Sequence, residues 1–146
     1  KIFLKKAKKI KFTKKIFLDR SSSEFNHCQI YNQRKVNQWI KKNNLSSCKP
    51  EKLTLEKQIY LFNNASIILG AHGAAFTNII FCKPGTKIIE IIPANHPNRK
   101  CERISKILGL KYFRIVTKPD NTNKNFPFRI HLEKKHFKMI DKTINL

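Results

Sequence analysis

The residues best suited to chemistry lie in the run 70–78, which reads Gly-Ala-His-Gly-Ala-Ala-Phe-Thr-Asn. Small residues let a backbone come close to a ligand, and a helix that begins here would present free amide groups at its N-terminus. The pattern is typical of a phosphate cradle, although it also fits close packing of a strand on a helix, with His72 as an ordinary loop histidine. The candidate donors to a diphosphate are His72, Thr77, Asn78 and the backbone N–H groups of Gly73 and Ala74.

Two charged residues complete the candidate site. Glu90 interrupts the apolar run 87–92, where its carboxylate would either accept hydrogen bonds from ribose hydroxyls or pair with a nearby lysine or arginine. Arg20 follows a short apolar run and would either clamp a phosphate or pair with an acidic neighbour, Asp19 or Glu24. Ligands of open α/β sheets bind outside the carboxyl ends of the strands, and both residues stand near such ends.

Neither a metal ion nor another cofactor is predicted. No Asp-x-Asp pair is present to hold a divalent cation against a diphosphate, so we expect diphosphate binding without a metal. The four cysteines form no Cys-x-x-Cys pair, which leaves neither a zinc knuckle nor a redox motif. We therefore expect reduced thiols.

Short apolar runs alternate with helical periodicity, which predicts an α/β fold: a Rossmann-like, three-layer domain with a mainly parallel sheet. The predicted strands span 16–18, 66–69, 87–92 and 112–116. These elements would bring the candidate residues to one edge of the sheet.

Two of the helices that should cover this sheet have clear signatures. One begins after Thr54, a good N-cap residue, and should pack on the sheet through Leu55, Ile59 and Phe62. A final basic helix spans about 131–144. No stretch approaches the ~18 apolar residues that a membrane-spanning helix needs.

The charge balance favours an anionic partner. The chain has 31 Lys and Arg against 9 Asp and Glu, a formal net charge of +22. Nucleic acid, an anionic membrane surface and a phosphate-bearing small molecule all fit this charge. A biased nucleotide composition would also produce it, since Ile and Asn are abundant too.

Over the segments 61–78 and 81–90 the sequence resembles glycosyltransferase family 61, and a looser similarity covers 16–115. The Gly-x-His-Gly-Ala stretch followed by Thr-Asn is its most distinctive part. The resemblance implies an inverting transferase of the GT-B type, built from two Rossmann-like domains; metal independence is expected from the lack of an Asp-x-Asp pair. Arg20, the donor loop and Glu90 match the family's donor-binding positions.

By this resemblance, residues 16–146 are the C-terminal, nucleotide-sugar-binding domain, and the lysine-rich residues 1–15 are a basic connector. His72 would be catalytic, stabilising the leaving diphosphate. The N-terminal acceptor domain is expected to be absent from this chain, which would then be an incomplete enzyme of polysaccharide biosynthesis.

The expected partners are a nucleotide diphosphate sugar, a glycan acceptor and the missing N-terminal domain. We expect a cytoplasmic location, with peripheral contact to an anionic membrane surface as an open alternative. Nucleic acid is not favoured as a partner, because no recognition motif is present. A nucleic-acid-binding module and a degenerate nucleotide-binding fold that serves as an interaction domain are the rival hypotheses.

Overall fold

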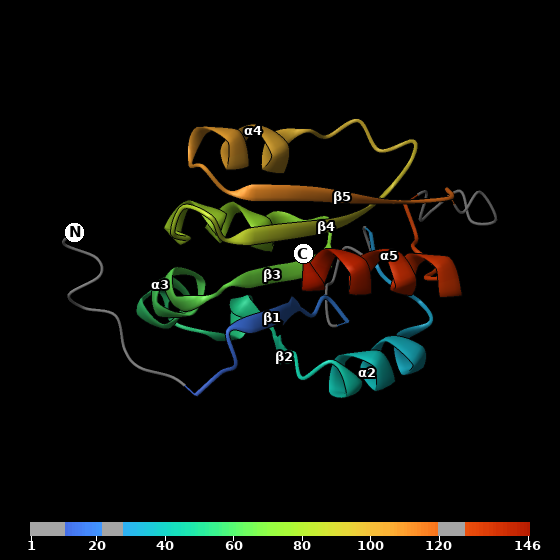
Figure 1. Cartoon of the computed structure of the whole chain (residues 1–146), viewed down its shortest axis with the longest axis horizontal. Helices are drawn as coiled ribbons and strands as arrows, with labels where there is room; N and C mark the ends of the chain where they lie inside the picture. The colour runs from blue at the N-terminus through green and yellow to red at the C-terminus, as the bar shows by residue number, and fades with distance from the viewer. Residues whose placement is uncertain (1–10, 22–27, 120–127) are drawn as a thin grey trace.

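The computed structural model describes residues 11–21, 28–119 and 128–146 and centres on a five-stranded sheet (Figure 1). All four pairs of neighbouring strands are parallel, and the strand order is β2-β1-β3-β4-β5. The strands are β1 (Lys15–Leu18), β2 (Ser46–Cys48), β3 (Ile67–Ala71), β4 (Lys87–Pro93) and β5 (Lys111–Thr117). The predicted α/β fold with a parallel sheet is confirmed.

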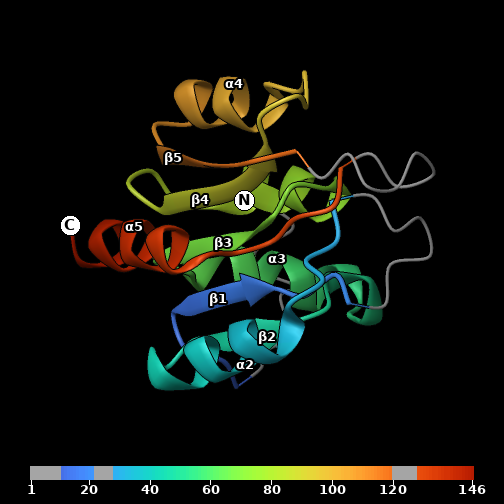
Figure 2. The same cartoon turned by 90° about the vertical axis from the view of Figure 1, so that its right-hand side faces the viewer.

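Helices cover both faces of the sheet (Figure 2). The helical elements are α2 (Gln33–Lys42), η1 (Pro50–Lys52), α3 (Leu55–Asn64), η2 (Ala74–Phe81), α4 (Lys100–Ile107) and α5 (Lys134–Asn145). Alternate residues of the strands point to opposite faces, so Phe17 and Leu69 pack with α2 and α5, whereas Ile16 and Ile68 pack with α3, η2 and α4. The result is three layers with a hydrophobic core on each side of the sheet.

The chain changes direction across the sheet between β1 and β3. From β1 it passes outward to β2, and it then returns to β3 on the other side of β1 and continues to β4 and β5. Because α2 and α3 cover opposite faces, the carboxyl ends of β1 and β3 are adjacent at a topological switch point. This is where ligands bind in open α/β sheets.

Close approach of β1 and β3 depends on Gly70. In register, Gly70 lies between Leu18 of β1 and Glu90 of β4. A Cβ added at Gly70 would stand 2.9 Å from the Cβ and 3.0 Å from the carbonyl oxygen of Leu18. The glycine therefore lets the strands that flank the switch point meet without a clash.

Three predicted details differ from the structure. The predicted strand set lacked β2, an edge strand whose sequence Ser-Ser-Cys contains no apolar run. Leu55 does not pack on the sheet: its side chain is 53% exposed in the first turn of α3, whereas Ile59 and Phe62 are buried as predicted. The helix after the donor loop, η2, is a 3-10 helix.

Other boundaries lie close to the predicted ones. The strand expected at 16–18 begins at Lys15, inside the predicted connector, whose residues 1–10 lie outside the described part of the chain. The last helix begins at Lys134 rather than near His131. Within the described residues, no helix has the length and apolar character needed to span a membrane.

Candidate functional site

The carboxyl ends of β1, β3 and β4 bring most of the predicted site residues to one edge of the sheet. Arg20 follows β1, and His72 and Gly73 follow β3. Glu90 lies within β4, on the face covered by α3, η2 and α4. The backbone N–H of His72 donates to the carbonyl of Ile91, 2.8 Å away, and so extends the β3–β4 pairing by one residue.

A buried cluster of polar side chains surrounds Glu90, which is 1% exposed. Its Oε1 lies 2.5 Å from Nδ1 of His72, and its Oε2 accepts a hydrogen bond from the hydroxyl of Tyr112 at 2.6 Å. The thiol of Cys101, in α4, also donates to this carboxylate. Four side chains from the end of β3, β4, β5 and α4 thus converge under the candidate site.

These contacts decide the charge state of Glu90. Burial alone would raise its pKa, but hydrogen bonds from His72, Tyr112 and Cys101, together with the charge of His72, outweigh burial and hold the pKa of Glu90 below its usual value. An ionised carboxylate only accepts hydrogen bonds, so Nδ1 of His72 carries the proton that joins the pair. The cluster therefore fixes both the ring orientation and the proton position of His72.

The surroundings of Glu90 bear on both hypotheses for it, ribose binding and pairing with a lysine or arginine. Neither a lysine nor an arginine pairs with it in the described residues; a histidine, a tyrosine and a cysteine do. With 1% exposure, the carboxylate lies beneath His72 and not on an open surface. This position suits a residue that orients His72 better than one that binds a ribose.

His72 itself lies next to a second histidine. The rings of His72 and His96 have centroids 4.4 Å apart, and Phe128 packs on the far side of His96 at 4.7 Å. Both histidines are more than nine-tenths buried, and Nη2 of Arg114 donates to the carbonyl of His96 at 3.4 Å. The loop after β4 is thus held against the end of β3.

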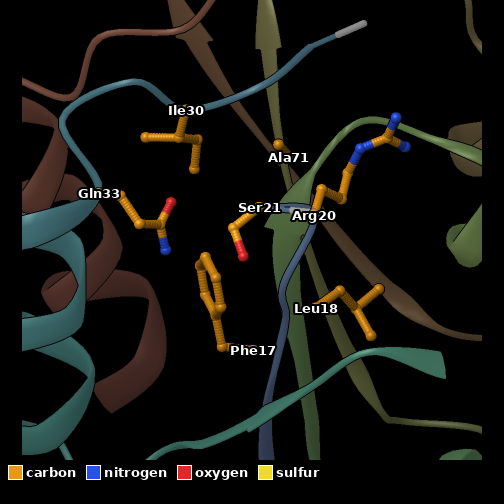
Figure 3. Close-up of a pocket in the computed structure, with 7 residues that line it drawn as sticks. All are labelled: Phe17, Leu18, Arg20, Ser21, Ile30, Gln33 and Ala71. Atoms are coloured by element: carbon orange, nitrogen blue, oxygen red, sulfur yellow. The ribbon is translucent and has the colours of Figure 1, made fainter. Parts of the chain in front are cut away.

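Arg20 reaches the site from the opposite side, by packing on Gly73. A Cβ added at Gly73 would overlap Nη1 of Arg20, so the absence of a side chain at this position makes room for the guanidinium. Figure 3 shows that the Arg20 side chain points away from Phe17, Ile30 and Gln33, which line the small cavity beside it. Burial lowers the pKa of Arg20, and its charge is therefore partly desolvated.

Asp19, the proposed acidic partner of Arg20, has contacts of its own. It pairs with Lys49 at 3.8 Å and accepts a hydrogen bond from the backbone of Ser21. Glu24, the other proposed partner, lies outside the described residues.

The remaining residues of the predicted donor loop are either exposed or bonded to a neighbouring helix. Ala74 and Thr77 are exposed at the start of η2 and within it. The side-chain amide of Asn78 instead donates to Gln58 of α3 at 2.7 Å, and Gln58 in turn donates to the carbonyl of Leu53. Asn78 therefore holds η2 against α3.

Sequence reasoning did not identify Tyr112 or Cys101 as members of the site, nor the contact between His96 and His72. Tyr112 and Cys101 have the spacing of ordinary strand and helix residues. The available signal was Glu90 itself, because a carboxylate inside an apolar strand requires buried donors nearby. The sequence does not show which residues supply them.

The cluster also offers a possible set of metal ligands. One ligand atom each of His72, Glu90 and Cys101 lies within 4.8 Å of the other two. However, the same atoms are joined by hydrogen bonds, and burial raises the pKa of Cys101, so that its sulfur is a protonated thiol in these contacts. The donor set is therefore better described as a hydrogen-bonded cluster.

The four cysteines agree with the prediction of reduced thiols. All are buried and free. Burial raises the pKa of Cys28 and Cys82 to about 12 and that of Cys48 to about 11. Such thiols are protonated at neutral pH, and a thiol is a weaker nucleophile than a thiolate.

Comparison with known proteins shows which family this chain matches. The family model described as glycosyltransferase 61 matches residues 2–89, more than half of the chain. A β-1,2-xylosyltransferase of Arabidopsis thaliana is 38% identical over 60 residues, which make up 41% of this chain and 11% of that protein.

Two further relatives are similar over comparable segments. The β-1,2-xylosyltransferase RCN11 of Oryza sativa subsp. japonica is 32% identical over 63 residues, 43% of this chain and 12% of the relative. The xylan glycosyltransferase MUCI21 of Arabidopsis thaliana is 41% identical over 46 residues, 31% of this chain and 9% of the relative. The chain thus matches only about a tenth of the length of these curated relatives.

Proposed function

Because the chain belongs to the glycosyltransferase 61 family, we propose that it forms the donor-binding part of an inverting, metal-independent glycosyltransferase of the GT-B type. The observation that carries this proposal is the buried pair of His72 and Glu90 at the switch point of the sheet. His72 lies inside the segment that the family model matches, and Glu90 is the residue directly after it.

The proposed donor is a nucleotide diphosphate pentose and the proposed acceptor is a glycan. The names of the relatives support both, since they describe xylosyl transfer and action on xylan. The acceptor hydroxyl attacks the anomeric carbon from the face opposite the diphosphate, so a new carbon–oxygen bond forms as the bond to the diphosphate breaks. A separate acceptor-binding domain supplies most acceptor contacts and the base that takes the hydroxyl proton.

His72 acts on the leaving group in this proposal. The diphosphate departs with the bonding electron pair, and negative charge grows on its oxygens. The ionised carboxylate of Glu90 accepts from Nδ1 and fixes the ring. In this proposal Nε2 also carries a proton and donates a hydrogen bond to a phosphate oxygen. Together with nearby arginine and lysine side chains, His72 takes the part that a divalent cation plays elsewhere.

Calorimetry with uridine diphosphate tests donor binding. We expect the chain to bind it equally well with and without a chelator, and His72→Ala to weaken binding by about 1 to 3 kcal/mol, the scale for a charge-assisted hydrogen bond at a desolvated site. His131→Ala is the control, because this partly buried histidine contacts Tyr31 rather than the candidate site.

Two results would contradict the proposal. Loss of binding in chelator would mean that a metal ion is part of the donor site. Unchanged binding by His72→Ala, with the variant folded, would remove His72 from it.

A further inference from the structure

A basic concavity lies beside the candidate site, between the end of β4 and the start of α4. It has a volume of about 370 Å³, and we call it the α4 pocket. Its lining residues are His96, Pro97, Asn98, Arg99, Lys100 and Arg103. This volume lies within the range of about 300 to 1,000 Å³ that is usual for small-molecule sites.

The charges around the α4 pocket favour an anion. Three cationic side chains line it, Arg99, Lys100 and Arg103, and no acidic residue does. The neighbouring Glu102 pairs with Arg99 at 3.1 Å, an exposed pair, whereas Lys100 and Arg103 form no ion pair within the described part of the chain. A guanidinium and an ammonium together suit phosphate oxygens, the first by its planar fork and the second as a point charge.

The α4 pocket is continuous with the candidate site through one residue. His96 lines the pocket, and its ring contacts the ring of His72 with centroids 4.4 Å apart. A ligand that fills the pocket and extends across His96 would therefore reach His72. The covalent chain of a nucleotide sugar, from diphosphate to sugar, offers such an extended shape.

On the opposite side of the site, the described residues line a much smaller cavity. The cavity between Arg20, Gln33 and Ala71 measures about 10 Å³, which is at the lower limit for a single water molecule (Figure 3). The guanidinium of Arg20 already occupies the space above Gly73. Of these two cavities, only the α4 pocket is large enough for a diphosphate.

We infer that the α4 pocket is the diphosphate subsite of the donor, with Lys100 and Arg103 as its principal ligands. The inference rests on the proposed function for the identity of the nucleotide sugar. It moves the diphosphate from the small-residue loop before η2 to the loop after β4. The diphosphate then extends across His96, with its sugar-bearing phosphate toward His72.

Calorimetry with inorganic diphosphate tests the subsite directly. We expect the double variant Lys100→Ala, Arg103→Ala to bind diphosphate at least tenfold more weakly than the unmodified chain. The matched control is Lys106→Ala, Lys111→Ala, which removes the same charge from exposed residues that do not line the pocket. The control should retain binding within about twofold, and circular dichroism should show that both double variants are folded.

The outcomes separate the subsite from the proposed function. Equal losses in the two double variants, or no loss in either, would overturn the subsite. If His72→Ala still weakens the binding of uridine diphosphate in that case, the proposed function stands without the α4 subsite. A different outcome would support the anion site but not the proposed function. In that case only the pocket variant would lose affinity for diphosphate, His72→Ala would leave the affinity for uridine diphosphate unchanged, and uridine diphosphate would bind no more tightly than diphosphate.

Discussion

At the scale of single residues, Glu90 explains the organisation of the site. A carboxylate with 1% exposure carries a large desolvation cost unless several donors offset it. His72, Tyr112 and Cys101 supply those donors from three different elements. Removing any one of them leaves a buried charge short of a partner, so the cluster is expected to respond as a unit.

The lowered pKa of Glu90 makes stability depend on pH in a defined direction. A carboxyl group whose pKa is lower in the folded than in the unfolded state adds stability that is fully present above its usual pKa of 4.5 and is lost as the pH falls through the folded value. We therefore expect the difference in free energy of unfolding between the unmodified chain and Glu90→Gln to be larger at pH 7 than at about pH 3.5. Urea denaturation at both pH values measures it.

Glu102→Gln is the control for this pH dependence, because Glu102 forms an exposed pair with Arg99. Exposed pairs contribute about 0 to 1 kcal/mol, so this variant should follow the unmodified chain at both pH values. A constant difference between Glu90→Gln and the unmodified chain would show that Glu90 is not ionised in the folded protein.

At the scale of elements, Gly70 in β3 and Gly73 just after it are required for different reasons. A Cβ at Gly70 would meet the Cβ and backbone of Leu18, which cannot move without separating β1 from β3. A Cβ at Gly73 would meet the end of the Arg20 side chain, which can swing away. The same substitution therefore tests strand packing at one position and site geometry at the other.

We expect Gly70→Ala to lower the free energy of unfolding by about 1 to 3 kcal/mol, the usual cost of overpacking, and Gly73→Ala to change it by less than about 1 kcal/mol. Thermal and urea denaturation of the two variants, each the control of the other, measure the difference. Equal losses would show that Arg20 is held as firmly above Gly73 as the backbone of β1 is held beside Gly70.

The elements also show which parts of the fold a sequence can predict. β3 and β4 were predictable because their apolar runs are buried on both faces. β2 was not, since Ser46, Ser47 and Cys48 form an edge strand through backbone pairing with β1 alone. Leu55 was predicted to pack on the sheet because its spacing fits the apolar face of α3. Spacing does not show that the first turn of a helix extends beyond the sheet, and there Leu55 is exposed.

The same reasoning applies to the site. The switch-point rule correctly brought His72 and Glu90 together from their strand positions. It could not identify Tyr112 or Cys101, because the register of β4 with β5 and the rotation of α4 depend on tertiary packing. Nor could spacing alone show that Asn78 binds Gln58 of α3, twenty residues earlier.

At the scale of the whole molecule, the net charge of +22 supports two different partners. Nucleic acid would be attracted by the summed charge of many lysines, and its binding would weaken steeply with salt. A nucleotide sugar would depend on the few groups that contact it. Exposed lysines on the α2 and α5 face, which is opposite the α4 face of the sheet, separate these possibilities.

Two sets of substitutions, tested against two ligands, distinguish the partners. Replacing the exposed lysines Lys41, Lys42 and Lys138 by glutamine should leave binding of uridine diphosphate within about twofold, because solvent screens charges beyond about 8 Å at physiological salt. His72→Ala should weaken that binding but leave any binding to a single-stranded oligonucleotide unchanged. A nucleic-acid-binding module would behave in the opposite way. Each lysine removed would lower its affinity for the oligonucleotide and reduce the salt dependence of binding, and His72→Ala would have no effect. Tight, lysine-dependent oligonucleotide binding without measurable binding of uridine diphosphate would therefore assign this chain to nucleic acid, and family membership would then describe its fold but not its ligand.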